Sequence, residues 1–113
     1  MREIAVKSSL DRIRQLIDEH DAILFLKGTP EFPMCGYSAQ AVNALNKAGH
    51  GHIRYVNIMA DAELRANLPR LSNWPTFPQF FLHGELLGGA DILAELLDSG
   101  ELQRIVAELD KAA

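Results

Sequence analysis

Hydrophobic positions along the chain follow two different spacings, and these alternate from one end to the other. Dense or alternating apolar runs of a few residues are typical of strands. Such runs occupy residues 22–26, 53–58, 77–82 and 85–87. Apolar residues three and four positions apart are typical of one helix face. They recur in residues 10–17, 39–47, 64–71, 91–97 and 101–109.

The order of these segments, αβαβαββαα, predicts an α/β fold. Strands that alternate with helices favour a parallel βαβ half. The last two strands flank His83 and Gly84, a hairpin signal that adds an antiparallel half. We therefore expect a four-stranded mixed sheet flanked by helices, built as one domain over residues 1–113.

Several residues with strong preferences for helix ends lie at the predicted boundaries. Ser8 or Ser9 can cap the first helix and Asp61 the third, because short polar side chains accept from the free N–H groups of a first turn. Gly49 follows the second helix and is expected to end it. Gly100 separates the last two helices.

Composition narrows the functional classes. Apolar residues make up 48% of the chain, which is typical of a globular protein. The apolar runs are far shorter than the roughly 20 residues of a membrane-spanning helix, and the N-terminus lacks the apolar core of a signal peptide. The formal net charge is −4, with no block of basic residues. Neither a membrane nor a nucleic acid is therefore an expected partner.

A single cysteine, Cys35, carries the clearest chemical signal. It lies between the 22–26 strand and the 39–47 helix, near free N–H groups and the positive end of the helix dipole. These groups favour the thiolate, which is both the nucleophile and the metal ligand. Lys27, just after the strand, can add a positive charge. Because the chain has no second cysteine, Cys35 needs a thiol or a metal from outside.

The alternative for Cys35 is a small buried side chain in the core. Its neighbours Pro33, Gly36 and Ser38 argue against this, because they are typical of an exposed turn that leads into a helix. A lone free cysteine without a disulfide framework also suits a reducing compartment, which favours a cytoplasmic location.

Three further segments could carry chemistry, and each has a plainer alternative. Pro78, at the start of a strand-like run, indicates either a special geometry such as a cis bond or an ordinary loop. The glycines at 88–89 precede a helix, where N–H groups can hold a carboxylate or where Asp91 simply caps a turn. His50 and His52 could bind a metal with the cysteine, or could belong to a glycine-rich surface turn.

Together and in this order, these segments resemble the monothiol glutaredoxins of the single-domain type. The matching stretches are residues 27–30, 33–38, 73–79, 84–86, 88–91 and 99–102. The resemblance extends from about Ser9 to Leu109. One departure is Tyr37, because the family's usual active-site segment is Cys-Gly-Phe-Ser. The ring is kept, so we expect its role to survive, with an effect on cluster lability or partner preference.

The resemblance implies a thioredoxin fold that binds glutathione beside Cys35. In this family two subunits typically hold one [2Fe–2S] cluster, with one protein cysteine and one glutathione thiol as ligands from each side. Ser38 stands where dithiol relatives keep a resolving cysteine. The expected function is that of a homodimeric carrier, with Cys35 as cluster ligand, that delivers the cluster to apo iron–sulfur proteins.

The resemblance also assigns a glutathione site. Its residues are Lys27, Arg65, Phe77, Pro78, Gly89, Ala90 and Asp91. Lys27, aided by Arg65, would pair with the glycine carboxylate of glutathione. Phe77, before a cis Pro78, would offer its backbone to the cysteinyl part. The turn at 89–91 would hold the γ-glutamyl end.

Two other functions stay open. An enzyme of thiol–disulfide exchange would use the Cys35 thiolate to attack a protein–glutathione mixed disulfide, and free glutathione would resolve the product. A regulatory module would instead share a cluster with a BolA-type partner that supplies a ligand, as the family is known to do.

Overall fold

The predicted order of helices and strands is present in the computed structural model, which describes residues 2–49 and 52–112. One short 3₁₀ helix, η1, is added after the second strand. The elements are α1 (Arg2–Asp18), β1 (Ala22–Leu26), α2 (Gly36–Ala48), β2 (Arg54–Asn57), η1 (Ile58–Ala60), α3 (Ala62–Ser72), β3 (Gln79–Leu82), β4 (Glu85–Gly88), α4 (Ala90–Ser99) and α5 (Glu101–Ala112). Among the described residues, no helix combines the length and the apolar character that crossing a membrane requires.

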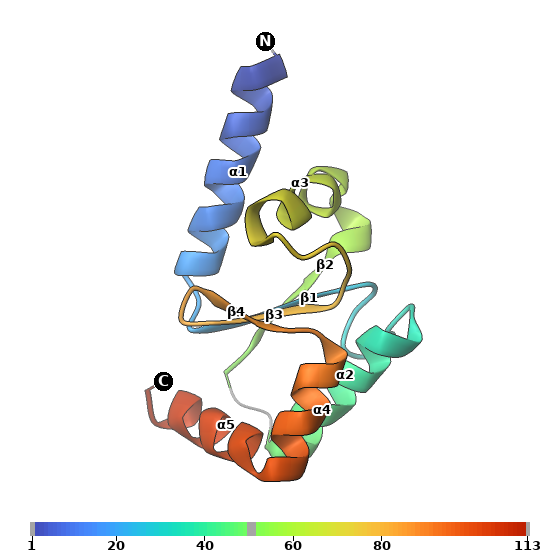
Figure 1. The fold of residues 1–113 in the computed structure, drawn as a ribbon, viewed down its shortest axis with the longest axis vertical. Helices are drawn as coiled ribbons and strands as arrows, with labels where there is room; N and C mark the ends of the chain where they lie inside the picture. Colours follow the sequence, from blue (N-terminus) through green and yellow to red (C-terminus); the bar gives the residue numbers. More distant parts are fainter. Residues whose placement is uncertain (1, 50–51, 113) are drawn as a thin grey trace.

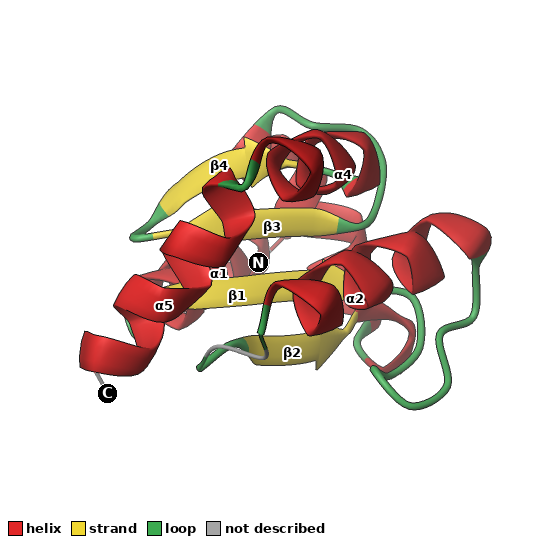
Figure 2. Ribbon diagram, turned by 90° about the horizontal axis from the view of Figure 1, so that it is seen from below, coloured by secondary structure: helices red, strands yellow, loops and turns green. Residues whose placement is uncertain are grey.

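The four strands form one mixed sheet in the order β2-β1-β3-β4 (Figure 2). β1 pairs parallel with β2 and antiparallel with β3, and β3 pairs antiparallel with β4. α1 and α3 cover one face of the sheet, while α2, α4 and α5 lie on the other (Figure 1). The predicted parallel half and antiparallel hairpin are both confirmed.

The central strand β1 is buried on both faces, which explains its unbroken apolar run. Side chains alternate across a strand, so its residues divide between two cores. Leu24 and Leu26 pack with α2, α4 and α5, and Phe25 packs with α1 and α3. The Phe25 ring meets Phe81 of β3 edge to face, with ring centroids 5.7 Å apart.

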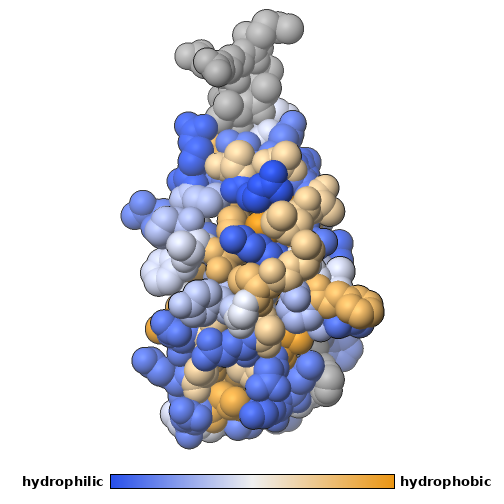
Figure 3. Space-filling view, turned by 90° about the vertical axis from the view of Figure 1, so that its right-hand side faces the viewer, coloured by the Kyte–Doolittle hydropathy of each residue, from blue (hydrophilic) through white to orange (hydrophobic). Residues whose placement is uncertain are grey.

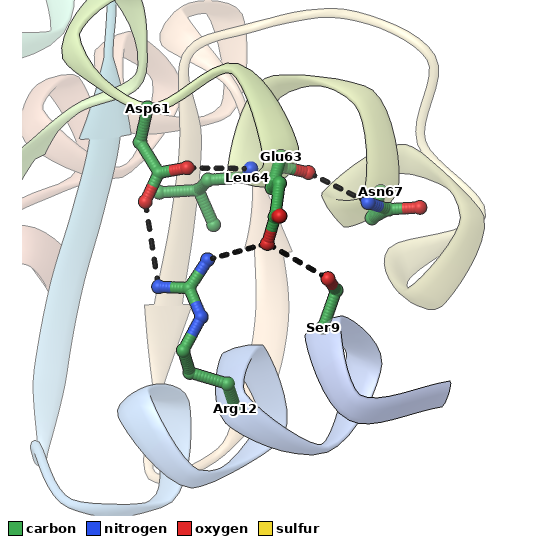
Figure 4. Close-up of polar contacts among 6 residues, drawn as sticks. All are labelled: Ser9, Arg12, Asp61, Glu63, Leu64 and Asn67. Atoms are coloured by element: carbon green, nitrogen blue, oxygen red, sulfur yellow. Dashed lines mark hydrogen bonds and ion pairs between the residues drawn. The ribbon is translucent and has the colours of Figure 1, made fainter. Parts of the chain in front are cut away.

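The prediction that Ser8 or Ser9 caps the first helix is wrong, because α1 begins at Arg2. Ser9 instead lies inside the helix, where its hydroxyl donates to Glu63 Oε2 at 2.9 Å (Figure 4). A serine is tolerated there because a tertiary partner takes up its hydroxyl. The cap preference is local, and here a contact with α3 overrides it.

Other boundaries also differ from the predictions by a few residues. α2 begins at Gly36, so its first turn includes residues that the sequence placed in the preceding turn. β2 occupies only residues 54–57 of the predicted 53–58, and β3 begins two residues later than predicted, at Gln79. Gly49 ends α2 as predicted, with a φ of 128° that favours glycine.

Candidate functional site

Cys35 is the N-cap of α2, the helix that follows the central strand. Its backbone is extended, and its Sγ accepts from the N–H of Ser38 at 3.4 Å. An N-cap side chain normally satisfies one of the free donors of the first turn with oxygen, and here the sulfur takes that place. The thiol is half-buried and lies at the positive end of the helix, as the sequence predicted.

Ser38 connects the thiol to the end of β1. It is fully buried, and its Oγ accepts from the Lys27 N–H at 3.0 Å and lies 3.4 Å from Cys35 Sγ. Because the oxygen already accepts from Lys27, its own hydrogen can point to the sulfur and stabilise a thiolate. The sequence predicted that Ser38 belongs to an exposed turn and stands in place of a resolving cysteine. The exposed position is wrong, because Ser38 is buried in the first turn of α2.

The pKa of the Cys35 thiol lies below its ordinary value. Partial burial acts against this and raises the pKa. The hydrogen bonds from the Ser38 hydroxyl and from the N–H groups of Ser38 and Tyr37, with the charge of Lys27, outweigh the effect of burial. The arrangement therefore favours the nucleophilic and metal-binding form of the sulfur.

The loop between β1 and α2 is closed by its own hydrogen bonds. Lys27 O accepts from the Met34 N–H at 2.8 Å, and the Gly28 N–H donates to Asn57 Oδ1 at 3.0 Å. Gly28 has a φ of 95°, and a Cβ there would collide with the Phe32 carbonyl oxygen. Glycine is therefore needed for the turn that fixes Lys27 beside the thiol.

A groove of about 780 Å³ opens beside the thiol. It is lined by Lys27, Cys35, Tyr37, Trp74, Thr76, Phe77, Pro78, Gly89, Ala90, Asp91, Ile92 and Glu95. Six of the seven residues that the resemblance assigned to glutathione are thus brought together with the cysteine. The Phe77–Pro78 bond is cis, as predicted, and Gly89 is the N-cap of α4.

Arg65 is the residue that the structure does not bring into the groove. It is exposed on α3, and its Nη1 donates to the Ile58 carbonyl at 3.3 Å. Its proposed help to Lys27 therefore stays a prediction. Sequence reasoning missed Ile92 and Glu95, although Glu95 lies one helical turn after Asp91 and so shares its face.

The groove carries charges of both signs. Lys27 extends from the end of β1, whereas Asp91 and Glu95 lie on α4. Phe77 and Pro78 line the same groove. A small zwitterionic peptide with a carboxylate at one end and an ammonium at the other fits this charge pattern.

Large apolar side chains are exposed around the thiol. Phe32, Met34 and Tyr37 are 80%, 66% and 64% exposed, and all three lie within three residues of Cys35 in the sequence. Trp74 shares the groove with Tyr37. Figure 3 views the side of the molecule on which the loop before α2 lies, and apolar groups gather across its middle. Such exposed groups indicate an interaction surface.

Within the described residues, His52 does not form a metal-binding group with the cysteine. His52 precedes the start of β2, whereas the end of β2 contacts the Cys35 loop through Asn57. The Nδ1 atom of His52 lies 3.2 Å from Asp110 Oδ1. His50 lies outside the described residues. Across residues 2–49 and 52–112, no group of three or more His, Cys, Asp or Glu side chains is placed to hold a metal ion.

The β2-β1-β3-β4 sheet, the thiol at the start of α2 and the cis-proline on the same groove define a thioredoxin-fold thiol protein. Comparison with known proteins identifies the branch. The family model for glutaredoxin matches residues 22–87, and the chain belongs to the glutaredoxin family. Its single cysteine makes it the monothiol type.

Individual relatives agree with this assignment. Glutaredoxin 4 of Escherichia coli K12 is 44% identical over 103 residues, which cover 91% of this chain and 89% of that protein. Reduced poplar apo GrxS14 is 39% identical with a TM-score of 0.68, over 95% of this chain and 94% of its own. A buckwheat glutaredoxin–glutathione complex shares the fold, with a TM-score of 0.76 and 21% identity over 92% of both chains.

Proposed function

We propose that the chain is a carrier that binds a [2Fe–2S] cluster together with glutathione and transfers the cluster to apo-proteins. The observation that supports this most directly is the position of its sole thiol. Cys35 is held as a helix cap with a lowered pKa, and it opens into a charged groove. The cluster is the cargo of such a protein, and the ligands of the cluster must include thiolates.

Glutathione is the proposed occupant of the groove. Its glycine carboxylate would face Lys27, its cysteinyl part would pair with the backbone at Phe77, and its γ-glutamyl end would reach the turn at 89–91. The charge pattern of the groove supports this orientation. Glutathione as the ligand is further supported by the buckwheat glutaredoxin of the same fold, whose structure is a glutathione complex.

Two subunits are proposed because of the number of ligands. A cluster of this type takes four ligands, usually thiolates. Each chain has one cysteine, so a dimer supplies two sulfurs and two glutathione molecules would supply the others. The exposed Phe32, Met34 and Tyr37 offer apolar surface that a second subunit could cover. A BolA-type protein could replace one subunit in a mixed complex. The proposed location of the protein is a reducing cytoplasm.

Anaerobic reconstitution tests this proposal. The purified chain is incubated with iron and sulfide, with or without glutathione, and separated by size with detection of visible absorbance. A coloured dimer is expected only with glutathione, and a colourless monomer without it. A stable coloured dimer formed without any small thiol would contradict the ligand set and return attention to His50 and His52.

Thiol–disulfide exchange is a second candidate, favoured by the lowered pKa of Cys35. The thiolate would attack the glutathione sulfur of a protein–glutathione disulfide, so that the protein leaves as a thiolate. A second glutathione thiolate would attack the new mixed disulfide, releasing oxidised glutathione and restoring Cys35. A turnover assay on a glutathionylated substrate measures this activity, and turnover without cluster binding would make this function the main one.

A further inference from the structure

Gln79 is a polar residue in the middle of the protein core. It is the first residue of β3 and is fully buried. Its backbone lies opposite Phe25 in the central strand β1. Glutamine is seldom fully buried unless its amide has partners, so the position of this side chain calls for an explanation.

The amide nitrogen of Gln79 binds the segment that precedes it. Nε2 donates to the Trp74 carbonyl at 2.9 Å and to the Thr76 carbonyl at 3.1 Å. Residues 74, 76, 77 and 78 all line the groove beside Cys35. One buried side chain therefore ties one wall of the groove to the central sheet.

The amide oxygen of Gln79 has no such partner. Among the described residues, Oε1 is a buried side-chain atom without any hydrogen bond. Its position follows from the two carbonyls, since both are acceptors and require the NH₂ group to face them. An unpaired buried acceptor lowers stability, so it offsets part of the stability that the two hydrogen bonds of Nε2 contribute.

The opposite wall leaves little room for this segment to move. A Cβ built on Gly89 would lie 3.1 Å from the Pro78 carbonyl oxygen and 3.8 Å from Trp74 Nε1. The 74–78 segment is thus close to the start of α4. A small displacement of the segment would change the width of the groove at the point where the peptide backbone of a ligand must pass.

We propose that Gln79 is a positioning residue, which holds the 74–78 segment in the shape that binds the peptide part of glutathione. This role rests on the proposed glutathione site. It explains why an amide is kept at a fully buried position despite its unpaired oxygen. Gln79 does not touch the groove, so it acts only through the two carbonyls that it holds.

The test compares Gln79→Met with Phe81→Leu. Methionine fills a similar volume without hydrogen-bonding groups. Phe81 is a buried apolar residue two positions further along the same strand, and it belongs to the α1–α3 core. Glutathione affinity is measured by calorimetry and stability by urea unfolding. Trp74, the only tryptophan, reports on the segment through its fluorescence emission and anisotropy without any ligand.

For Gln79→Met we expect glutathione affinity to fall about ten- to a hundredfold, since small misplacements can have effects of this size. Its urea midpoint should change little, because the loss of two hydrogen bonds is offset by removal of the unpaired buried oxygen. Trp74 should become more mobile. Phe81→Leu should lose stability and keep its affinity. Unchanged affinity and fluorescence in Gln79→Met would overturn the proposal. So would a result in which both variants lose affinity in proportion to their loss of stability.

A second variant covers failure to fold. Gln79→Asn keeps the amide but is too short to reach both carbonyls, so it should also free Trp74 and weaken binding; a rigid Trp74 in Gln79→Asn would overturn the proposal. The fluorescence arm separates this inference from the proposed function. If the wild-type chain binds no glutathione, the proposed function fails. Independently of that result, the positioning role fails if Trp74 stays rigid in Gln79→Met.

Discussion

Two helices of this protein begin with the same device and put it to different uses. Cys35 caps α2 and Asp61 caps α3, and each side chain accepts from the N–H three residues later. The pKa of each group lies below its ordinary value. For Asp61 the main cause is the hydrogen bond from the Leu64 N–H. Burial raises the pKa of Asp61, and the charge and hydrogen bond of Arg12 lower it further.

The surroundings of the two caps explain the difference. Asp61 lies between α1 and α3, where Arg12 bridges it and Glu63 at 3.3 and 3.6 Å (Figure 4). Its charge is already paired. Cys35 lines the groove, and the charge of Lys27 contributes less to its lowered pKa than the hydrogen bonds do. A helix start that lowers a pKa thus stabilises the fold in one place and leaves a reactive group in the other.

The largest effect is expected from Cys35→Ser. Serine is a good N-cap, so the fold should be retained, but its hydroxyl is a poor ligand for iron in place of a thiolate. Cluster absorbance after reconstitution should be lost, with an unchanged circular dichroism spectrum. A variant that keeps the absorbance would mean that Cys35 is not a ligand.

Lys27→Glu should weaken glutathione binding by roughly ten- to a hundredfold, because a charge-assisted hydrogen bond is lost and a like charge is added. Calorimetry measures the affinity. Lys47→Glu is the matched control, since it changes the net charge equally on the exposed end of α2. Equal affinities for both variants would remove Lys27 from the site.

Ser38→Ala removes the hydroxyl donor from Cys35 while the backbone donors remain. The pKa of Cys35 should rise, because one hydrogen bond that stabilises the thiolate is lost. The pH dependence of thiol alkylation measures this shift. Ser99→Ala, at the end of α4, should leave the profile unchanged, whereas an unshifted profile in Ser38→Ala would contradict the assigned hydrogen bond.

The smallest effect is expected from Asp61→Ala, which should lower stability by about 1 kcal/mol, as is typical for an N-cap. Because folding lowers its pKa, Asp61 contributes stability above its unfolded pKa of roughly 4, and this is lost as the pH falls through its folded pKa. Urea midpoints near pH 7 and pH 3 measure the difference, which should be larger at pH 7. A change in the alkylation profile of Cys35 would show that the two caps are coupled.

The sequence by itself determined the elements and their local ends. The apolar run at 22–26 gave β1 its bounds, and Asp61 and Gly49 marked helix ends correctly. These features depend on residues within one turn of each other, so a pattern in the chain is enough to show them. The motif segments likewise placed Cys35 between a strand and a helix.

Only the tertiary structure decided which distant groups meet. Ser38 bonds to Lys27 across eleven positions, and Ser9 bonds to Glu63 across 54. Arg65 bonds to the Ile58 carbonyl and does not line the groove. Gln79 holds two carbonyls of the segment before it, while its backbone pairs with β1. Such contacts depend on how the helices pack on the sheet, and packing is a property of the whole chain that local spacing does not encode.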